Sequence, residues 1–516
     1  MRRLLLLAVS AVAAACGTVN DKPSCTTSAS CGAGKYCAPT ADGNVCWPDA
    51  TAPVVSSVTV TCDASPCVRD SKLTVTASAS DDAELAGVEV SLDLDAARWV
   101  ALARTGATWT GTLALREWAF PAFSKAVVAT ARATDGAGNQ GTKAAAGVSV
   151  TRLRWAVDAL AGSSAALSPP AVMTDGTIVV GNANHQLLSL TPAGTQAEDP
   201  LSIGGGAITS IAVGDKAVWV GSDDGGLSAA NLDRKTVLAG VGVNVEGAIR
   251  GGLAVLPGTV EWAFAGGEGG RLNGAPTSGP PATSGKSTYI AGPVIATGNV
   301  FAVTSNAASL LKQFTFDGAL TEGWTSGVGS SVTLQPALTA SNVFVTVASD
   351  AKLMKTTAAG ATSLVTTLAD SVSEPPIVLS GDEIVAGDIN GAVHRTSIAG
   401  TAIWSTPPNL GAIPVGALAI SGSTVKLLVG TRAGSVFALD NAGATVWNTT
   451  LTGAPLLKGS NISAPSAETP VTSTAYFSAS NGKVYAVIVD GTLDTSAPWP
   501  KAFRDRRNRS NAGLTP

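Results

Sequence analysis

The sequence predicts an all-β protein, and three observations support this fold class. Charged residues make up only 14% of the 516 residues, whereas long helices and coiled coils are rich in charged helix formers. Glycine accounts for 57 residues, about 11% against the usual ~7%, which suits many tight turns. Hydrophobic residues reach 45%, which excludes a disordered chain, and short β-branched runs alternate with turn residues, as many short strands require.

The net charge of the chain is −4. A charge this small creates no overall field that would recruit nucleic acid or an anionic membrane. We therefore expect no nucleic-acid partner.

The N-terminus has the pattern of a signal peptide. Arg2 and Arg3 precede an apolar run at 4–12, and three alanines then lead to Cys16. The run is shorter than the ~20 residues that a membrane-spanning helix needs. A cysteine after small residues, followed by Gly17, resembles a bacterial lipobox, which implies that Cys16 becomes a lipidated N-terminus. Ordinary secretion with cleavage nearby is the alternative. Because Gly17 is not aspartate, the resemblance favours the outer membrane.

All seven cysteines lie in the first 67 residues. If Cys16 carries lipid, six remain, an even number that suits disulfides in an oxidising compartment. Four of them follow a C-x5-C-x5-C-x8-C spacing, for which three pairings are possible, and the last two close a small loop. Zinc is the competing interpretation, but these spacings differ from those of zinc modules. The disulfide candidates are Cys25, Cys31, Cys37, Cys46, Cys62 and Cys67.

Residues 51–152 are predicted to form a β-sandwich, because short β-branched runs recur there at intervals of about 8–20 residues. The stretch Ala133–Gly141 resembles the penultimate hairpin of bacterial immunoglobulin-like surface domains, which implies an immunoglobulin-like sandwich. Its GxGxxG pattern is interpreted as a turn, since no helix follows. The runs are Val54–Val60, Leu73–Ala79, Val88–Leu94, Thr108–Leu113, Val127–Ala133 and Gly147–Thr151.

From Trp155 onward the sequence repeats, with about 45 residues per copy. Each copy has an apolar run, a turn, a second run and often a Trp, most clearly in Val425–Trp447, Glu383–Trp404 and Ala475–Val487. This period is typical of four-stranded propeller blades, which stack around an axis to bury both faces. We expect an eight-bladed β-propeller, with seven blades as the alternative. The residues that mark the copies are Gly181, Gly221, Gly266, Thr304, Ala348, Gly387, Gly430 and Ala479.

The repeat resembles that of pyrroloquinoline-quinone-type propellers, the family of the quinoprotein dehydrogenases and of the outer-membrane assembly lipoprotein BamB. The matching residues include Gly434–Val436, Ala438–Asp440, Gly443 and Trp447. In this family the Trp docks against the neighbouring blade. The resemblance implies that role for Trp155, Trp324, Trp404 and Trp447.

The two ends of the repeat region predict how the ring closes. Trp155 lies in a strand whose earlier blade strands are missing, and the stretch Trp499–Asp505 resembles the one beside the closure in such propellers. We expect the strand at Trp155 to complete the blade built from residues near 462–490, so that no sheet edge stays open.

The residues for enzymatic chemistry are scarce. Dehydrogenases of this family hold their quinone between a Trp and a disulfide of adjacent cysteines, with Ca²⁺ and an Asp base, but no cysteine follows Cys67. Only His185 and His394 are present, in different copies, so no catalytic zinc site is expected. We predict a non-enzymatic protein with no cofactor and no metal. Scattered carboxylates are interpreted as turn caps, namely Asp223, Asp224, Asp382, Asp388 and Asp440.

The last residues carry a basic patch, with Arg504, Arg506, Arg507 and Arg509 beside Lys501. Such a patch could contact anionic lipid headgroups or an acidic polymer. A solvated closure strand and tail is the alternative interpretation.

These patterns predict a lipid-anchored protein of the cell envelope, at the outer membrane and either periplasmic or surface-exposed. The propeller would serve as a platform for an envelope protein or a glycan. The alternatives are a quinone- or metal-dependent enzyme that uses the axial funnel, and a purely structural spacer. The expected domains are a signal peptide at 1–15, a lipidated Cys-rich stalk at 16–50, the sandwich at 51–152 and the propeller at 153–516.

Overall fold

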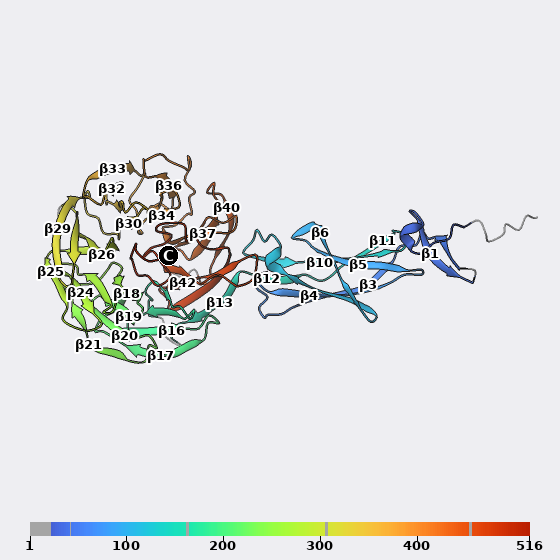
Figure 1. Cartoon of the computed structure of the whole chain (residues 1–516), viewed down its shortest axis with the longest axis horizontal. Coiled ribbons are helices and arrows are strands. Elements are labelled where there is room, and N and C mark those ends of the chain that lie inside the picture. The colour runs from blue at the N-terminus through green and yellow to red at the C-terminus, as the bar shows by residue number, and fades with distance from the viewer. Residues whose placement is uncertain (1–21, 42, 161–164, 305–307, 454–456) are drawn as a thin grey trace, which may run out of the picture. The chain divides into compact units, whose positions relative to one another are not determined.

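The computed structural model describes residues 22–41, 43–160, 165–304, 308–453 and 457–516. The expected signal peptide and the lipidation site Cys16 lie outside these residues. Within them, no helix is long and apolar enough to cross a membrane, and strands predominate (Figure 1). The short 3-10 helices are η2 (Ser28–Ser30) and η3 (Leu115–Glu117). The chain divides into one unit of residues 1–63, 72–114 and 126–149, and a second of residues 64–71, 115–125 and 150–516.

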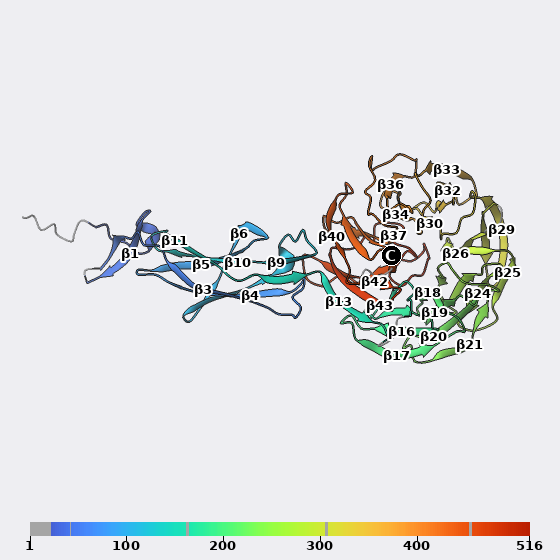
Figure 2. The same cartoon turned by 180° about the vertical axis from the view of Figure 1, so that it is seen from behind.

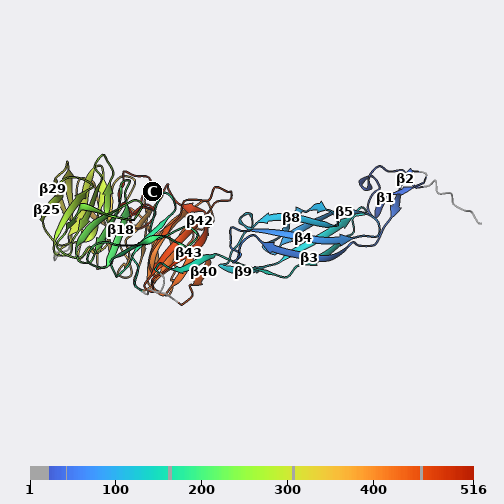
Figure 3. The ribbon, with the colours of Figure 1, turned by 90° about the horizontal axis from the view of Figure 1, so that it is seen from below.

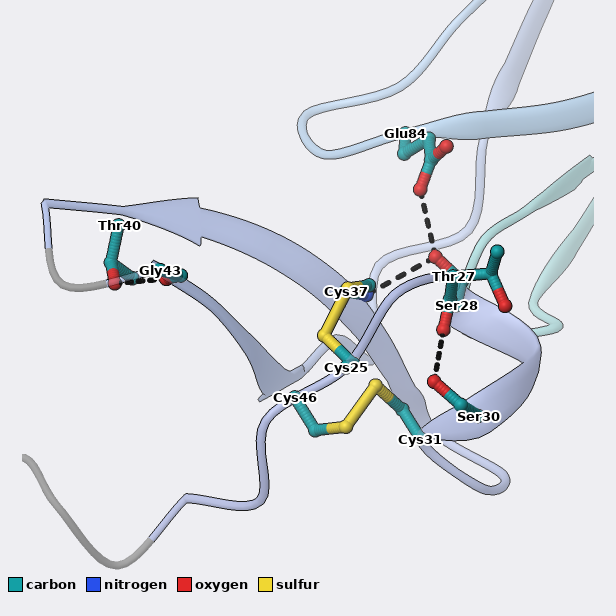
Figure 4. The surroundings of a disulfide bond; sticks show 10 residues. All are labelled: Cys25, Thr27, Ser28, Ser30, Cys31, Cys37, Thr40, Gly43, Cys46 and Glu84. Carbon is teal, nitrogen blue, oxygen red and sulfur yellow. Dashed lines mark hydrogen bonds between the residues drawn. A yellow bond between two sulfur atoms is a disulfide. The ribbon is translucent and has the colours of Figure 1, made fainter.

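Disulfides hold the beginning of the first unit. The strands β1 (Lys35–Thr40) and β2 (Gly43–Pro48) form an antiparallel hairpin. Cys25 is bonded to Cys37, and Cys31 is bonded to Cys46 (Figure 4). Of the three pairings that the spacing allowed, the structure has this one. Most residues of the hairpin are partly or fully exposed, so the two cross-links replace the missing core.

Side chains also tie the Cys-rich segment to the rest of its unit. The Ser28 hydroxyl donates a hydrogen bond to the Glu84 carboxylate at 2.8 Å and accepts one from the Cys37 backbone N–H at 3.1 Å (Figure 4). Cys62 and Cys67 are each disulfide-bonded as well.

The remainder of the first unit contains two four-stranded antiparallel sheets, in the orders β3-β4-β8-β7 and β11-β10-β5-β6. Alternate residues are buried along β4, for example Leu73 and Val75, and along β10, for example Ala131, because the inner faces pack together. The strands are β3 (Val54–Cys62), β4 (Lys72–Ser80), β5 (Leu85–Leu92), β6 (Asp95–Ala101), β7 (Ala103–Thr105), β8 (Thr108–Ala114), β10 (Ala129–Asp135) and β11 (Gln140–Ala144). A separate pair, β9 (Ser124–Val127) and β12 (Val148–Thr151), belongs in part to each unit.

The second unit is a β-propeller, a ring of antiparallel sheets seen face-on in Figures 1 and 2 and edge-on in Figure 3. The first four sheets follow one another in chain order. They are β14 (Ala171–Val172), β15 (Ile178–Gly181), β16 (Gln186–Leu190) and β17 (Gln196–Ser202); β18 (Ile208–Val213), β19 (Ala217–Ser222), β20 (Gly226–Asn231) and β21 (Val237–Asn244); β22 (Ala254–Leu256), β23 (Trp262–Gly266), β24 (Arg271–Pro276) and β25 (Ala282–Lys286); and β26 (Tyr289–Ala296), β27 (Asn299–Thr304), β28 (Leu310–Phe316) and β29 (Leu320–Gly327).

Four more sheets complete the ring in the described part of the chain. They are β30 (Ala337–Leu338), β31 (Phe344–Val347), β32 (Lys352–Thr356) and β33 (Thr362–Thr367); β34 (Ile377–Leu379), β35 (Glu383–Gly387) and β36 (Val393–Ser397); β37 (Pro414–Ser421), β38 (Leu427–Thr431), β39 (Ser435–Leu439) and β40 (Thr445–Thr450), extended by β44 (Thr492–Leu493); and β41 (Leu457–Ile462), β42 (Thr472–Ala479), β43 (Lys483–Asp490) and β13 (Leu153–Asp158).

Each residue that marks a copy of the sequence repeat lies within one residue of the end of the second strand of a separate sheet. The next sheet packs closely over this point. A Cβ atom on Gly181 would lie 2.1 Å from the Ile208 side chain, and one on Gly387 would lie 2.6 Å from Pro414. A small residue recurs there because apolar contacts between consecutive sheets form the core of the ring.

The last sheet takes its outer strand from the beginning of the unit. β13 pairs antiparallel with β43, with Trp155 opposite Ala486 and Val157 opposite Val484. This confirms the prediction that the strand at Trp155 completes the blade near 462–490. The pairing joins the two ends of the ring without leaving an open edge there.

Candidate functional site

The segment 499–512, which we call the axial tail, lies at the centre of the ring (Figures 1 and 2). It hydrogen-bonds to the innermost strand of one sheet after another. Backbone N–H groups of six sheets donate to its carbonyl groups at 2.8–2.9 Å. The pairs are Val172 to Arg506, Val213 to Arg507, Val255 to Arg509, Ile295 to Ser510, Val378 to Trp499 and Ala419 to Pro500.

Side chains connect the axial tail to the two remaining sheets. The Asn461 amide on β41 donates to the Arg506 carbonyl at 2.7 Å. The Gln335 amide, just before β30, donates to the Ser510 hydroxyl at 2.9 Å. The tail therefore has a hydrogen-bonding partner in or beside every sheet of the ring.

Unusual backbone conformations let the axial tail follow this path. Phe503, Arg504, Asn508 and Ser510 all have φ between 47° and 68°, in the left-handed region that residues other than glycine seldom adopt. Such conformations persist only where the surroundings hold them. Here Ser510 accepts a hydrogen bond from Ile295 on an inner strand, and backbone hydrogen bonds within the tail hold Phe503, Arg504 and Asn508.

Lys501 is enclosed within the tail, with 1% of its surface exposed. Its Nζ donates to the carbonyl groups of Ala502 at 2.5 Å and Asp505 at 3.2 Å, and to Asn508 Oδ1 at 2.7 Å. Burial lowers the pKa of Lys501 to about 7, and the charge of Asp505 partly opposes that shift. The Lys501 side chain therefore links Ala502, Asp505 and Asn508 of the tail by hydrogen bonds.

Arg504 is buried and belongs to the same internal structure. It is 7% exposed, and it donates to the carbonyl groups of Pro498, Asn511 and Leu514. Burial lowers its pKa to about 10. Arg504 therefore does not belong to a solvated basic patch, and the sequence-based expectation of an exposed tail is corrected here. Composition does not reveal that backbone carbonyl groups surround this guanidinium.

The other three arginines of the expected patch line a pocket of about 240 Å³ at one mouth of the ring. Arg507 forms an ion pair with Asp215 at 2.6 Å, and Arg509 forms one with Asp505 at 2.6 Å. Burial lowers the pKa of Arg506. The pocket is lined by Val172, Met173, Thr174, Gly176, Ala464, Asp505, Arg506, Arg507, Arg509, Thr515 and Pro516.

Three of the four Trp residues lie against a turn of the following sheet. The indole N–H groups of Trp155, Trp324 and Trp404 each donate at 3.0 Å, to the carbonyl groups of Pro192, Ala358 and Asn441 respectively. Each ring covers the glycine of that turn so closely that a Cβ atom there would lie 2.7–3.2 Å from the indole. The acceptors and glycines are Pro192 and Gly194, Ala358 and Gly360, and Asn441 and Gly443.

Trp447 has different surroundings. The sheet that follows β40 takes its outer strand from β13, so it has no turn from its third to its fourth strand. Trp447 instead lies 5.9 Å from the Phe123 ring and 5.0 Å from the Arg152 guanidinium. Its buried indole nitrogen has no hydrogen bond to any residue that the structure describes. Ring closure by a distant strand therefore removes the docking partner that the resemblance implied.

The scattered carboxylates mostly accept hydrogen bonds in turns. Asp388 accepts from the backbone N–H groups of Asn390 and Ala392, and also lies 2.8 Å from His394 Nε2. Asp440 accepts two backbone N–H groups in the same way. Asp224 accepts from the Gly226 N–H and the Ser222 hydroxyl, and Asp382 accepts from the Ala340 N–H. His185 lies in a turn with φ 49°.

One acidic group was missed in the sequence, because its members come from distant segments. Carboxylate oxygens of Asp49, Asp81 and Asp135 lie within 4.8 Å of one another in the first unit. Asp135 accepts three hydrogen bonds, from Ala137 N–H and from the backbone and amide of Asn139. Burial, with the neighbouring carboxylates adding to it, raises the pKa of Asp81.

Comparison with known proteins shows similarity of fold alone. No family model and no curated protein matches the chain. A solved structure of the computationally designed Ika8 protein is 15% identical, with a TM-score of 0.51 over 64% of this chain and 98% of that one. BamB from Moraxella catarrhalis is 14% identical, with a TM-score of 0.48 over the same shares.

Proposed function

We propose that this chain is a non-enzymatic lipoprotein of the cell envelope, whose eight-bladed propeller is a binding platform for a protein or glycan partner. In this proposal, Cys16 carries the lipid that attaches the chain to the outer membrane. The Cys-rich segment and an immunoglobulin-like sandwich form the stalk and spacer. The platform needs no cofactor.

The observation that carries this proposal is the position of the axial tail. Its backbone carbonyl groups accept hydrogen bonds from the inner strands of six sheets, and Trp499, Lys501 and Arg504 are buried among them. A quinone- or metal-dependent enzyme of the axial type would need space that the tail occupies. The loops at the two faces of the ring are then the surfaces available to a large partner, as loops on a rigid scaffold commonly are.

Site-specific photo-crosslinking distinguishes the two faces. Ser341, between β30 and β31, and Ile389, between β35 and β36, are exposed at opposite ends of the blade strands. A photoreactive residue at each position, in the full chain mixed with solubilised envelope, should give one saturable protein or glycan adduct from one face only. Absence of an adduct from both faces, together with stoichiometric binding of quinone or Ca²⁺ in calorimetry, would favour the axial enzyme instead.

A further inference from the structure

The three arginines that line the pocket at the mouth of the ring, which we call the axial pocket, differ in their partners. The Arg507 guanidinium pairs with the Asp215 carboxylate and the Arg509 guanidinium with the Asp505 carboxylate, each at 2.6 Å. Arg506, which directly precedes Arg507 in sequence, has no side-chain hydrogen bond or ion pair within the described residues, and its Nε is buried without a partner. A guanidinium presents five N–H donors, so Arg506 has donors that no acceptor among the described residues satisfies.

The charges at the pocket leave an excess of one positive charge. Among the side chains, Arg506, Arg507 and Arg509 line the pocket with Asp505, and Asp215 lies outside the lining but pairs with Arg507. Asp505 attracts Arg506 electrostatically but forms its ion pair with Arg509, and a partly buried guanidinium without an ion pair of its own is unfavourable. An anion in the pocket would remove that cost, and arginine binds carboxylates and phosphates in a bidentate geometry.

The backbone at Arg506 is held before any ligand arrives. Its carbonyl accepts hydrogen bonds from the Val172 N–H at 2.8 Å and from the Asn461 amide at 2.7 Å. Val172 lies on the inner strand of the first sheet and Asn461 on that of the last, so both ends of the ring fix this position. A side chain that starts from a fixed backbone loses less freedom on binding.

The size and lining of the pocket limit the ligand to a small molecule. Its volume is about 240 Å³, below the ~300–1,000 Å³ that is typical of pockets for drug-sized ligands. Val172, Met173 and Ala464 add apolar surface beside the arginines. The lining thus suits a compact oxyanion with a short apolar part.

We propose that this pocket is a binding site for a small oxyanion, a carboxylate- or phosphate-bearing molecule held chiefly by Arg506. Arg507 and Arg509 line the same pocket, each in an ion pair with a carboxylate. The site goes beyond the platform function and is independent of it, because a protein or glycan partner on the loops needs no small ligand at the axis.

Calorimetry on the intact chain tests the site, with inorganic phosphate and propionate as separate probes at low ionic strength. We expect saturable binding of at least one probe, with one site per chain, and the two titrations tell which oxyanion the site prefers. Arg506→Gln should weaken the preferred probe at least about tenfold, as loss of a charge-assisted bidentate contact predicts. The control Arg250→Gln, whose exposed side chain pairs with Glu268 and does not line the pocket, should leave the affinity unchanged.

A second variant reaches the pocket without altering the axial tail. Ala464 is exposed and lines the pocket from the segment after β41, so Ala464→Trp should fill the space and abolish binding even if Arg506→Gln does not fold. Absence of saturable binding of both probes at millimolar concentration overturns the proposal. Equal affinity of wild type, Arg506→Gln and Ala464→Trp overturns it as well.

Discussion

The Cys-rich hairpin and the propeller axis are stabilised in different ways. In both regions the strands are short, and a segment outside them holds them in place. In the hairpin, the bonds Cys25–Cys37 and Cys31–Cys46 are covalent and little surface is buried. At the axis, the tail is held by hydrogen bonds to the inner strands and by buried side chains. The comparison teaches that a covalent link substitutes for a core where the segment is too small to build one.

The largest effect is expected at the axis. Trp499 is fully buried, packs into a core cluster that includes Val378 and Leu338, and pairs through its backbone with Val378. Trp499→Ala should lower the free energy of unfolding of the propeller by about 3–5 kcal/mol, because it leaves a large cavity. Thermal unfolding followed by calorimetry measures this loss. A change below about 1 kcal/mol would show that the tail contributes little to the ring.

Removing one disulfide should destabilise the hairpin and leave the propeller unchanged. The bond Cys31–Cys46 closes a loop with a sequence separation of 15, so the double substitution Cys31→Ser and Cys46→Ser should cost about 3 kcal/mol locally. Limited proteolysis should then cleave within residues 22–50 while the propeller stays intact. Protection equal to wild type in that segment would contradict the role assigned to the cross-link.

Trp docking can be separated from backbone strain with a matched pair of glycines. Gly360 and Gly298 both have positive φ, 88° and 77°, but a Cβ atom on Gly360 would lie 3.0 Å from Trp324, whereas one on Gly298 would meet nothing within 4 Å. Both substitutions to Ala should cost about 1–2 kcal/mol from the left-handed conformation. Gly360→Ala should cost at least ~1 kcal/mol more, from overpacking. Equal losses in denaturant titrations would argue against tight docking.

The last expected effect is a pH dependence of stability at Lys501. Its pKa is lowered to about 7 in the folded protein, against about 10.4 for a free lysine. Between these values the unfolded chain binds the proton more tightly, so the free energy of unfolding rises with pH from about 7 to 10, by up to about 1.4 kcal/mol per unit. Lys501→Met should lack this contribution. Parallel stability curves for the two proteins over that range would refute it.

Local patterns in the sequence predicted the repeat and its closure. The marker residues fall at the ends of second strands because the next sheet packs on them, as Ile208 does on Gly181. Trp155 predicted an outer blade strand whose earlier strands are missing before it, and the structure confirms that this strand, β13, pairs with β43. The repeat and its closure can be predicted from a single sequence, because they show as local motifs and as a fixed period along the chain.

Other features depend on contacts that spacing does not encode. The cysteine spacing is compatible with three pairings. In the structure Cys37 on β1 and Cys46 on β2 lie opposite each other, yet they bond to Cys25 and Cys31 of the preceding segment, which the spacing does not reveal. The acidic group of Asp49, Asp81 and Asp135 gathers three separate segments. The sequence-based interpretation of the tail rested on its basic side chains. Its position in the ring depends instead on hydrogen bonds to its backbone carbonyl groups, which every residue possesses and which sequence therefore does not distinguish.

Amide hydrogen exchange of the tail, measured by mass spectrometry on the intact chain, tests the central claim most directly. The N–H groups of Trp499 and Ala512 donate to the carbonyl groups of Val378 and Ile295 on inner strands. We predict that peptides covering 499–512 exchange as slowly as the inner strands themselves. Exchange as fast as that of an unfolded chain would contradict an occupied axis, and with it the main support for a platform rather than an axial enzyme.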